Sequence, residues 1–191
     1  MTLPFATRWL NKPVAFAEDG DTLTIEAGPR TDFFRSPQGD EPTLNAPAFL
    51  RPADGDFTLA ARVQVPFASS FDAGALMLWG DDERWAKLCF EFSPNREPMV
   101  VSVVTRGVSD DANGSLVDGN DVWLRIARVG SAYAFHSSVD GAWWRFARHF
   151  ALDGDVEIGF VAQSPTGEGC AVRFTDVQFE QRTLGDLRDG T

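Results

Sequence analysis

The sequence predicts an all-β fold: a two-sheet antiparallel jelly-roll sandwich. Three observations support this class. Short runs rich in Val, Phe, Ile, Trp and Thr recur along the chain, turn-forming segments separate them at regular intervals, and no stretch sustains the 3.6-residue apolar repeat of a helix. Many short strands joined by such turns are typical of a sandwich or barrel, and about ten or more of them favour two packed sheets.

The turns centre on Asp-Gly pairs and on clusters of Pro, Asn and Ser. Asp-Gly readily takes the positive φ angles that tight hairpin turns require. The segments with this chemistry are EDGD (18–21), PADGD (52–56), GDDE (80–83), SPNRE (93–97), VDGND (117–121), VDGA (139–142), LDGD (152–155) and SPTGEG (164–169).

Ten runs separated by turn residues are expected to form strands, because they combine β-branched and aromatic residues with short length. They lie at residues 22–27, 57–65, 73–80, 84–92, 99–107, 122–130, 132–139, 143–150, 156–164 and 171–181.

The bulk composition predicts one domain. The chain has 191 residues, of which 43% are apolar and 12% aromatic, enough to bury a sizeable core. We expect a single sandwich over residues 1–182 and a loose polar tail over 183–191.

The charge limits the partners. A formal net charge of −11 repels phosphate backbones and anionic lipids, so neither nucleic acid nor a membrane is expected. Saccharides, protein partners and homodimerisation remain open. Residues 1–13 show no signal peptide, so we expect a cytoplasmic protein in which Cys89 and Cys170 are buried free thiols.

The stretch WAKLCFEF (85–92) indicates how one strand is oriented. Ala86, Leu88 and Phe90 are apolar and alternate with a chemically capable set, which is typical of a strand with one face in the core. The same parity applied to the other central strands predicts an outward-facing set: Trp79, Trp85, Lys87, Glu91, Trp123, Arg125 and His136, with either Thr105 or Arg106.

Tryptophan is unusual on a solvent-facing sheet, because each indole exposes a large apolar area. Indole rings stack on the C–H faces of sugars, and charged groups bind sugar hydroxyls, so the outward set suggests a saccharide site. Two structural alternatives remain: Lys87 and Glu91 pair with charges on neighbouring strands, or another segment covers the tryptophans.

Several motifs occur in one order along the chain. TDFFRSP (31–37) comes first, then W-x-K-x-x-x-E from Trp85, V-V-T-x-G-x-S-D from Val103 and D-G-x-x-W from Asp140. Between Trp9 and about Glu180 the sequence resembles the DUF1349 family of the concanavalin A-like lectin/glucanase superfamily.

The resemblance implies a jelly roll whose concave sheet holds saccharide. On the matched motifs, it places these residues on or beside that sheet: Trp85, Lys87, Glu91, Thr105, Ser109 and Asp110. We therefore expect a non-catalytic, lectin-like protein, with a regulatory protein-interaction module as an alternative, because interfaces also favour Trp and Arg.

A glycan-active enzyme is a further alternative. Laminarinase-like relatives carry an E-x-D-x-x-E pattern, but here Cys89 precedes and Ser93 follows Glu91, so the paired carboxylates are missing. If the protein is a hydrolase or lyase, Glu91 and Lys87 are its candidate catalytic residues.

No cofactor or metal site is predicted. The 2 His and 2 Cys are far apart in sequence, which argues against zinc. The acidic runs at 109–114 and 117–121 lack the spacing of a calcium-binding EF-hand loop and are interpreted as turns. A surface calcium ion stays an alternative, since lectin-like sandwiches often carry one.

Overall fold

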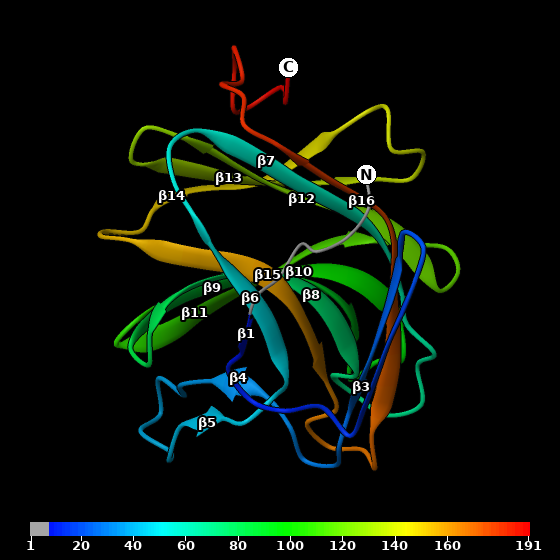
Figure 1. The fold of residues 1–191 in the computed structure, drawn as a ribbon. Helices are drawn as coiled ribbons and strands as arrows, with labels where there is room; N and C mark the ends of the chain where they lie inside the picture. Colours follow the sequence, from blue (N-terminus) through cyan, green and yellow to red (C-terminus); the bar gives the residue numbers. More distant parts are fainter. Residues whose placement is uncertain (1–7) are drawn as a thin grey trace.

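The computed structural model describes residues 8–191, so the first seven residues of the segment tested for a signal peptide lie outside it. Within the described range the regular structure is all strand, in two seven-stranded antiparallel sheets that face each other (Figure 1). The predicted fold class is confirmed. No helix in this range is long and apolar enough to cross a membrane.

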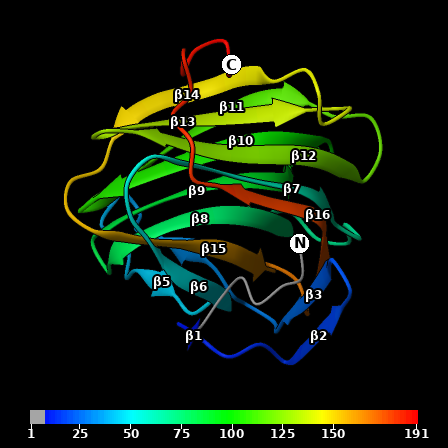
Figure 2. The same ribbon diagram turned by 45° about the horizontal axis from the view of Figure 1, so that its top comes forward.

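The two sheets are built from distant parts of the chain (Figure 2). Sheet A has the order β1 (Arg8–Trp9), β6 (Ala48–Ala53), β15 (Val156–Gln163), β8 (Ala73–Asp81), β9 (Arg84–Phe92), β10 (Pro98–Arg106), β11 (Val108–Leu116). Sheet B has the order β14 (Arg145–Ala151), β13 (Ala132–Ser138), β12 (Asp121–Val129), β7 (Phe57–Gln64), β16 (Cys170–Glu180), β3 (Thr22–Ala27), β2 (Ala15–Asp19).

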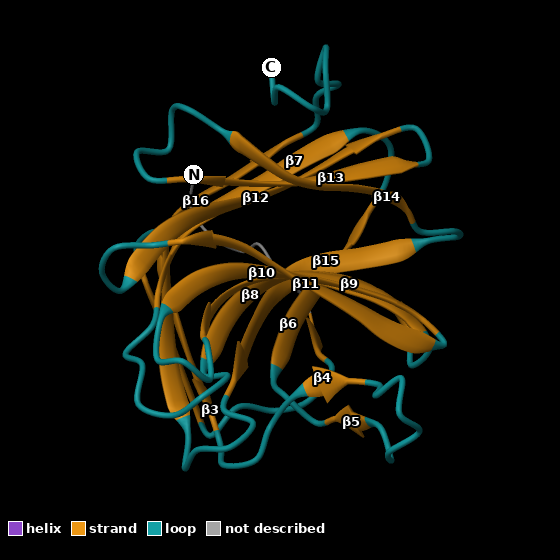
Figure 3. Cartoon of the chain, turned by 180° about the vertical axis from the view of Figure 1, so that it is seen from behind, coloured by secondary structure: helices purple, strands orange, loops and turns teal. Residues whose placement is uncertain are grey.

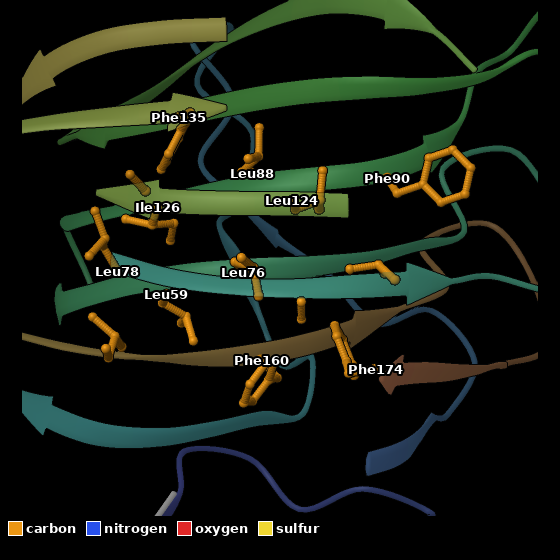
Figure 4. Close-up of a cluster of buried hydrophobic side chains, with 14 of the residues drawn as sticks. Leu59, Leu76, Leu78, Leu88, Phe90, Leu124, Ile126, Phe135, Phe160 and Phe174 are labelled. Carbon is orange, nitrogen blue, oxygen red and sulfur yellow. The ribbon is translucent and has the colours of Figure 1, made fainter. Parts of the chain in front are cut away.

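The main core fills the space between the sheets. Alternate residues of the central strands point inward, as the period-2 pattern predicts. Leu88 and Phe90 of β9 meet Leu124 and Ile126 of β12 in this layer (Figure 4). The inward parity is therefore confirmed for these strands.

The sequence did not predict β11 as a strand. It is an edge strand, and most of its residues are exposed polar or acidic groups. Charged residues on an edge strand discourage pairing with other chains, but they also remove the apolar alternation by which a strand is recognised. β6 was also missed because it contains Pro52, which is tolerated there because β1 pairs only with Phe49 and Leu50.

A short hairpin covers the outer face of sheet A. It consists of β4 (Phe33–Phe34) and β5 (Thr43–Leu44) and lies below sheet A in Figure 3. Phe33 is fully buried in a second apolar cluster between the hairpin and the sheet. This cover leaves only part of the face accessible.

The tail after β16 folds back over the outer face of sheet B, at the top of Figure 1. Leu184 is only 3% exposed. The carbonyls of Leu187 and Gly190 contact His136 and Arg125 of the sheet. The expectation of a loose tail is thus wrong, because two buried polar side chains of the sheet hydrogen-bond to its backbone.

Candidate functional site

The best-formed cavity lies on the outer face of sheet A, beside the β4–β5 hairpin. It encloses about 350 Å³, within the range typical of small-molecule sites. Its floor comes from β9, β10, β11 and β15, and Phe34 and Phe71 contribute aromatic walls. Polar groups also line it: Asp32, Lys87, Glu91, Asp111 and Gln163.

A more open groove of about 760 Å³ continues from this cavity along the hairpin. The two share Asp32, Phe34, Phe71 and Asp111 as lining residues. The combined hollow can therefore hold a ligand with one deep unit and further units outside.

Small side chains on β8 make the cavity possible. Ala73 lies opposite Glu91 on one side and Gln163 on the other, and Ala75 lies opposite Cys89. Because these methyl groups are short, the long side chains of the flanking strands can meet above β8. Lys87 of β9 donates to the Gln163 side chain of β15 at 2.7 Å in this way.

The Lys87 ammonium is charged and almost fully enclosed. Its side chain is 3% exposed, and Nζ lies 2.9 Å from a carboxylate oxygen of Asp32. Burial opposes the charge, but the neighbouring carboxylates, Asp32 foremost, outweigh it and raise the pKa of Lys87 above its ordinary value. The ion pair ties the start of the hairpin to the centre of sheet A.

Glu91 lies at the same floor, partly exposed to the cavity. Burial raises its pKa to about 7; the ammonium of Lys87 opposes this shift, and Asp32 and Asp111 add to it. No hydrogen bond to its carboxyl occurs among residues 8–191. Near neutral pH this carboxyl can therefore either donate or accept a hydrogen bond to a ligand.

Phe71 forms a wall of the cavity under backbone strain. Its φ is 70°, the left-handed region, which a bulky side chain rarely adopts. Its amide donates to the carbonyl of Phe92 at 2.7 Å, and its carbonyl accepts from the Gln163 side chain at 3.3 Å. Strain of this kind costs about 1–3 kcal/mol and concentrates at ligand-binding sites. The ring is 37% exposed and free to stack on a ligand.

Two predicted residues lie on the correct face but are covered. Trp79 is 5% exposed and Trp85 is fully buried. The ring of Phe33 packs on both, with centroids 5.5 and 6.1 Å away. Their burial corrects the expectation that they face open water, and it matches the alternative in which another segment covers them.

The structure also decides between Thr105 and Arg106. Thr105 faces the outer side of sheet A and its hydroxyl hydrogen-bonds to that of Ser109 at 2.9 Å, but it is fully buried. Arg106 points the other way and donates to the carbonyl of Ala151. Neither lines the cavity.

Asp110, another predicted residue, pairs with Arg148 at 3.0 Å and does not line the cavity. Its neighbour Asp111 does line it, because successive residues of a strand point to opposite faces. The motif residue Asp110 therefore lies on a strand that lines the cavity, but it is the next residue, Asp111, that reaches it.

The remaining predicted residues, Trp123, Arg125 and His136, lie on sheet B. The prediction that they share one hollow with Trp79 and Trp85 is wrong, because the outer faces of the two sheets point to opposite sides of the molecule. The Arg125 guanidinium stacks on Trp144 at 4.3 Å and donates to the Gly190 carbonyl at 2.9 Å.

Burial under the tail shifts the pKa values of both basic side chains. Burial lowers the pKa of Arg125 to about 10. Burial, and then the charge of Arg125, lowers the pKa of His136 to about 4, although the contact of its ring Nε2 with the Leu187 carbonyl at 2.7 Å opposes the shift. His136 is therefore neutral at physiological pH.

The cysteines form no disulfide bond. Cys89 and Cys170 are free and buried, as predicted, and burial raises the pKa of Cys170 to about 12. Within the described part of the chain, no three His, Cys, Asp or Glu residues are arranged to hold a metal ion.

The predicted site residues include Lys87 and Glu91 but not the other residues that line the cavity, among them Asp32, Phe71, Asp111 and Gln163. Asp32 lies in the TDFFRSP motif, so a signal existed. Asp111 could have been found only by knowing the parity of β11. Phe71 lies in a turn-rich segment and Gln163 at a strand end, and local sequence assigns neither a direction.

Comparison with known proteins identifies the family. The model of the DUF1349 family, described as a protein of unknown function, matches residues 9–182. The chain belongs to the DUF1349 family. It is 31% identical over 173 residues to Regulation of enolase protein 1 of Saccharomyces cerevisiae (strain ATCC 204508 / S288c), covering 88% of this chain and 86% of that protein.

Solved structures support the same fold for this DUF1349 chain. A functionally unknown protein from Saccharomyces cerevisiae superposes with a TM-score of 0.88 at 26% identity, over 97% of this chain and all of the other. The carbohydrate binding module CBM66 from Bacillus subtilis superposes with a TM-score of 0.58 at 16% identity, over 94% and 99% of the two chains. The second likeness shows the fold alone.

The motifs that carry the DUF1349 resemblance have structural roles here. In D-G-x-x-W, Asp140 accepts hydrogen bonds from the amides of Ala142 and Trp143. Gly141 has a φ of 73°, and a Cβ there would lie 2.8 Å from the Trp123 ring. Glycine is therefore required where the loop packs on Trp123. By contrast, two residues of W-x-K-x-x-x-E, Lys87 and Glu91, reach the cavity.

Proposed function

We propose that this protein binds a saccharide without transforming it, in the cavity on the outer face of sheet A. The observation that carries the proposal is the cavity of about 350 Å³ itself, which the Phe71 ring lines together with the polar groups of Glu91, Asp111 and Gln163. An exposed ring can stack on the C–H face of a sugar, while the floor binds its hydroxyls.

The relatives support this proposal. A carbohydrate binding module and a legume lectin-like domain from Entamoeba histolytica share the sandwich fold. Because one fold hosts many functions, the argument depends on the cavity and not on the likeness.

The first experiment is calorimetric titration with a panel of neutral, amino and acidic oligosaccharides. At least one should bind, and Phe71→Ala should weaken its binding about tenfold, equivalent to ~1.4 kcal/mol of lost stacking. Trp143→Ala is the matched control: this ring is 73% exposed on a loop beside sheet B, so affinity should not change.

A thermal melt of each variant shows that the fold persists. The proposal fails if no saccharide of the panel binds to the wild type. It also fails if Trp143→Ala removes binding while Phe71→Ala does not.

Hydrolysis or lysis by Glu91 stays a prediction, as does a regulatory interaction with another protein, towards which the name of the yeast relative points. Turnover of a polysaccharide panel, compared with Glu91→Gln, tests the first. A pull-down with the purified chain tests the second.

A further inference from the structure

The lining of the hollow is strongly one-sided in charge. The cavity and its adjoining groove contain five carboxyl groups against one ammonium, that of Lys87. The carboxyl groups belong to Asp32, Asp40, Glu41, Glu91 and Asp111. This imbalance bears on the kind of saccharide the site can hold.

The single cation is not available to an anionic ligand. Lys87 is 2% exposed and its ammonium is held by Asp32 at 2.9 Å and by Gln163 at 2.7 Å. A uronate or a phosphorylated sugar would bring a further negative charge beside unpaired carboxyl groups. Like charges held in one cavity repel each other, and they do so more strongly in a partly enclosed site than in water.

Two of the carboxyl groups, those of Glu91 and Asp111, form no salt bridge within the described part of the chain. The Glu91 carboxyl accepts no hydrogen bond within the described range, and Asp111 lies across the floor from it on β11. Asp40 and Glu41 extend the same charge along the groove, where further sugar units would lie.

We propose that the cavity selects a saccharide that carries amino groups, with the protonated amine near Glu91 and Asp111. The inference rests on the proposed function: the cavity and its aromatic walls define the site, and the carboxyl groups decide only the charge of its ligand. The site is thereby closed to the acidic sugars that a uronate-specific protein would bind.

Titration calorimetry at about pH 7, where a substantial fraction of both the Glu91 carboxyl and the sugar amines is charged, tests the inference with four probes. These are the β-1,4-linked trisaccharides of glucosamine and of N-acetylglucosamine, trigalacturonate, and spermidine. The glucosamine trimer should bind at least about tenfold tighter than its N-acetylated counterpart, with trigalacturonate weakest. Spermidine should bind less tightly than the glucosamine trimer, because it lacks rings for Phe71.

A matched pair of variants separates local from overall charge. Asp111→Asn should reduce the ratio between the amino and N-acetyl trimers at least about threefold. Asp110→Asn removes the same charge from the adjacent residue, which pairs with Arg148 outside the cavity, and should leave the ratio unchanged.

The outcomes distinguish the two proposals. Binding of the N-acetylated or acidic trimer as tight as that of the amino trimer overturns the amine selectivity and leaves the saccharide site intact. If spermidine binds as tightly as the amino trimer, the cavity recognises positive charge without recognising a sugar. That result also overturns the proposed selectivity for amino sugars. Absence of binding by any oligosaccharide overturns both.

Discussion

Glu91 combines a carboxyl group that reaches the cavity with a pKa raised to about 7 by burial. Its folded pKa exceeds its unfolded value of about 4.5, so the unfolded chain binds fewer protons between these values. The stabilisation is complete below about pH 4.5 and is lost as the pH rises through about 7. The loss is on the order of 1–3 kcal/mol.

We predict that carbon NMR of the Glu91 carboxyl gives an apparent midpoint near 7. Urea unfolding at several pH values should show that Glu91→Gln removes this component of the decline in stability above pH 5. A midpoint near the ordinary glutamate value, or an unchanged pH profile in the variant, would contradict the description of the cavity floor.

At the same scale, the sequence predicted that Lys87 and Glu91 lie on the outer face of one strand, because alternation along a strand is a local property, and both line the cavity. It could not identify the partner of Lys87. Asp32 lies 55 positions away, and only the folded hairpin brings it to 2.9 Å.

At the scale of elements, two covering segments determine which outward side chains meet water. The β4–β5 hairpin buries Trp79 and Trp85, and the C-terminal tail buries Arg125 and His136. Neither segment has an apolar repeat from which its packing partner could be predicted. The exposure of a sheet face therefore could not be predicted, although its parity could.

The tail gives a prediction about His136, which faces Arg125, Asp189 and the Leu187 carbonyl. Because its pKa is lowered from 6.5 to about 4, its contribution to stability is complete above pH 6.5 and is lost as the pH falls towards 4. Deleting residues 184–191 should return water to the ring and raise its pKa towards 6.5.

Proton NMR of the two histidine rings measures this directly, because the chain contains only 2 His and His149 is exposed on β14. An unchanged His136 midpoint in the shortened chain would show that the tail is not the cause of its burial.

At the scale of the whole molecule, the order of strands in the sheets governs the site. Regular turns and strand alternation were enough to predict the sandwich. These patterns do not predict which strands share a sheet. Because β9 belongs to sheet A and β12 to sheet B, the outward-facing residues of the two strands lie on opposite sides of the molecule. That assignment depends on contacts between residues far apart in sequence.

The net charge of −11 is consistent with the same view of the site, since the cavity and groove are acidic like the molecule. A cationic or neutral ligand approaches such a surface without repulsion.

One measurement tests the central claim most directly: a crystal structure with the saccharide that binds most tightly in the panel. The account predicts a sugar ring stacked on Phe71, with its polar groups within hydrogen-bonding distance of Glu91 or Gln163. Density for the sugar on sheet B, over Trp143 or Trp144, with the cavity of sheet A unchanged, would contradict it.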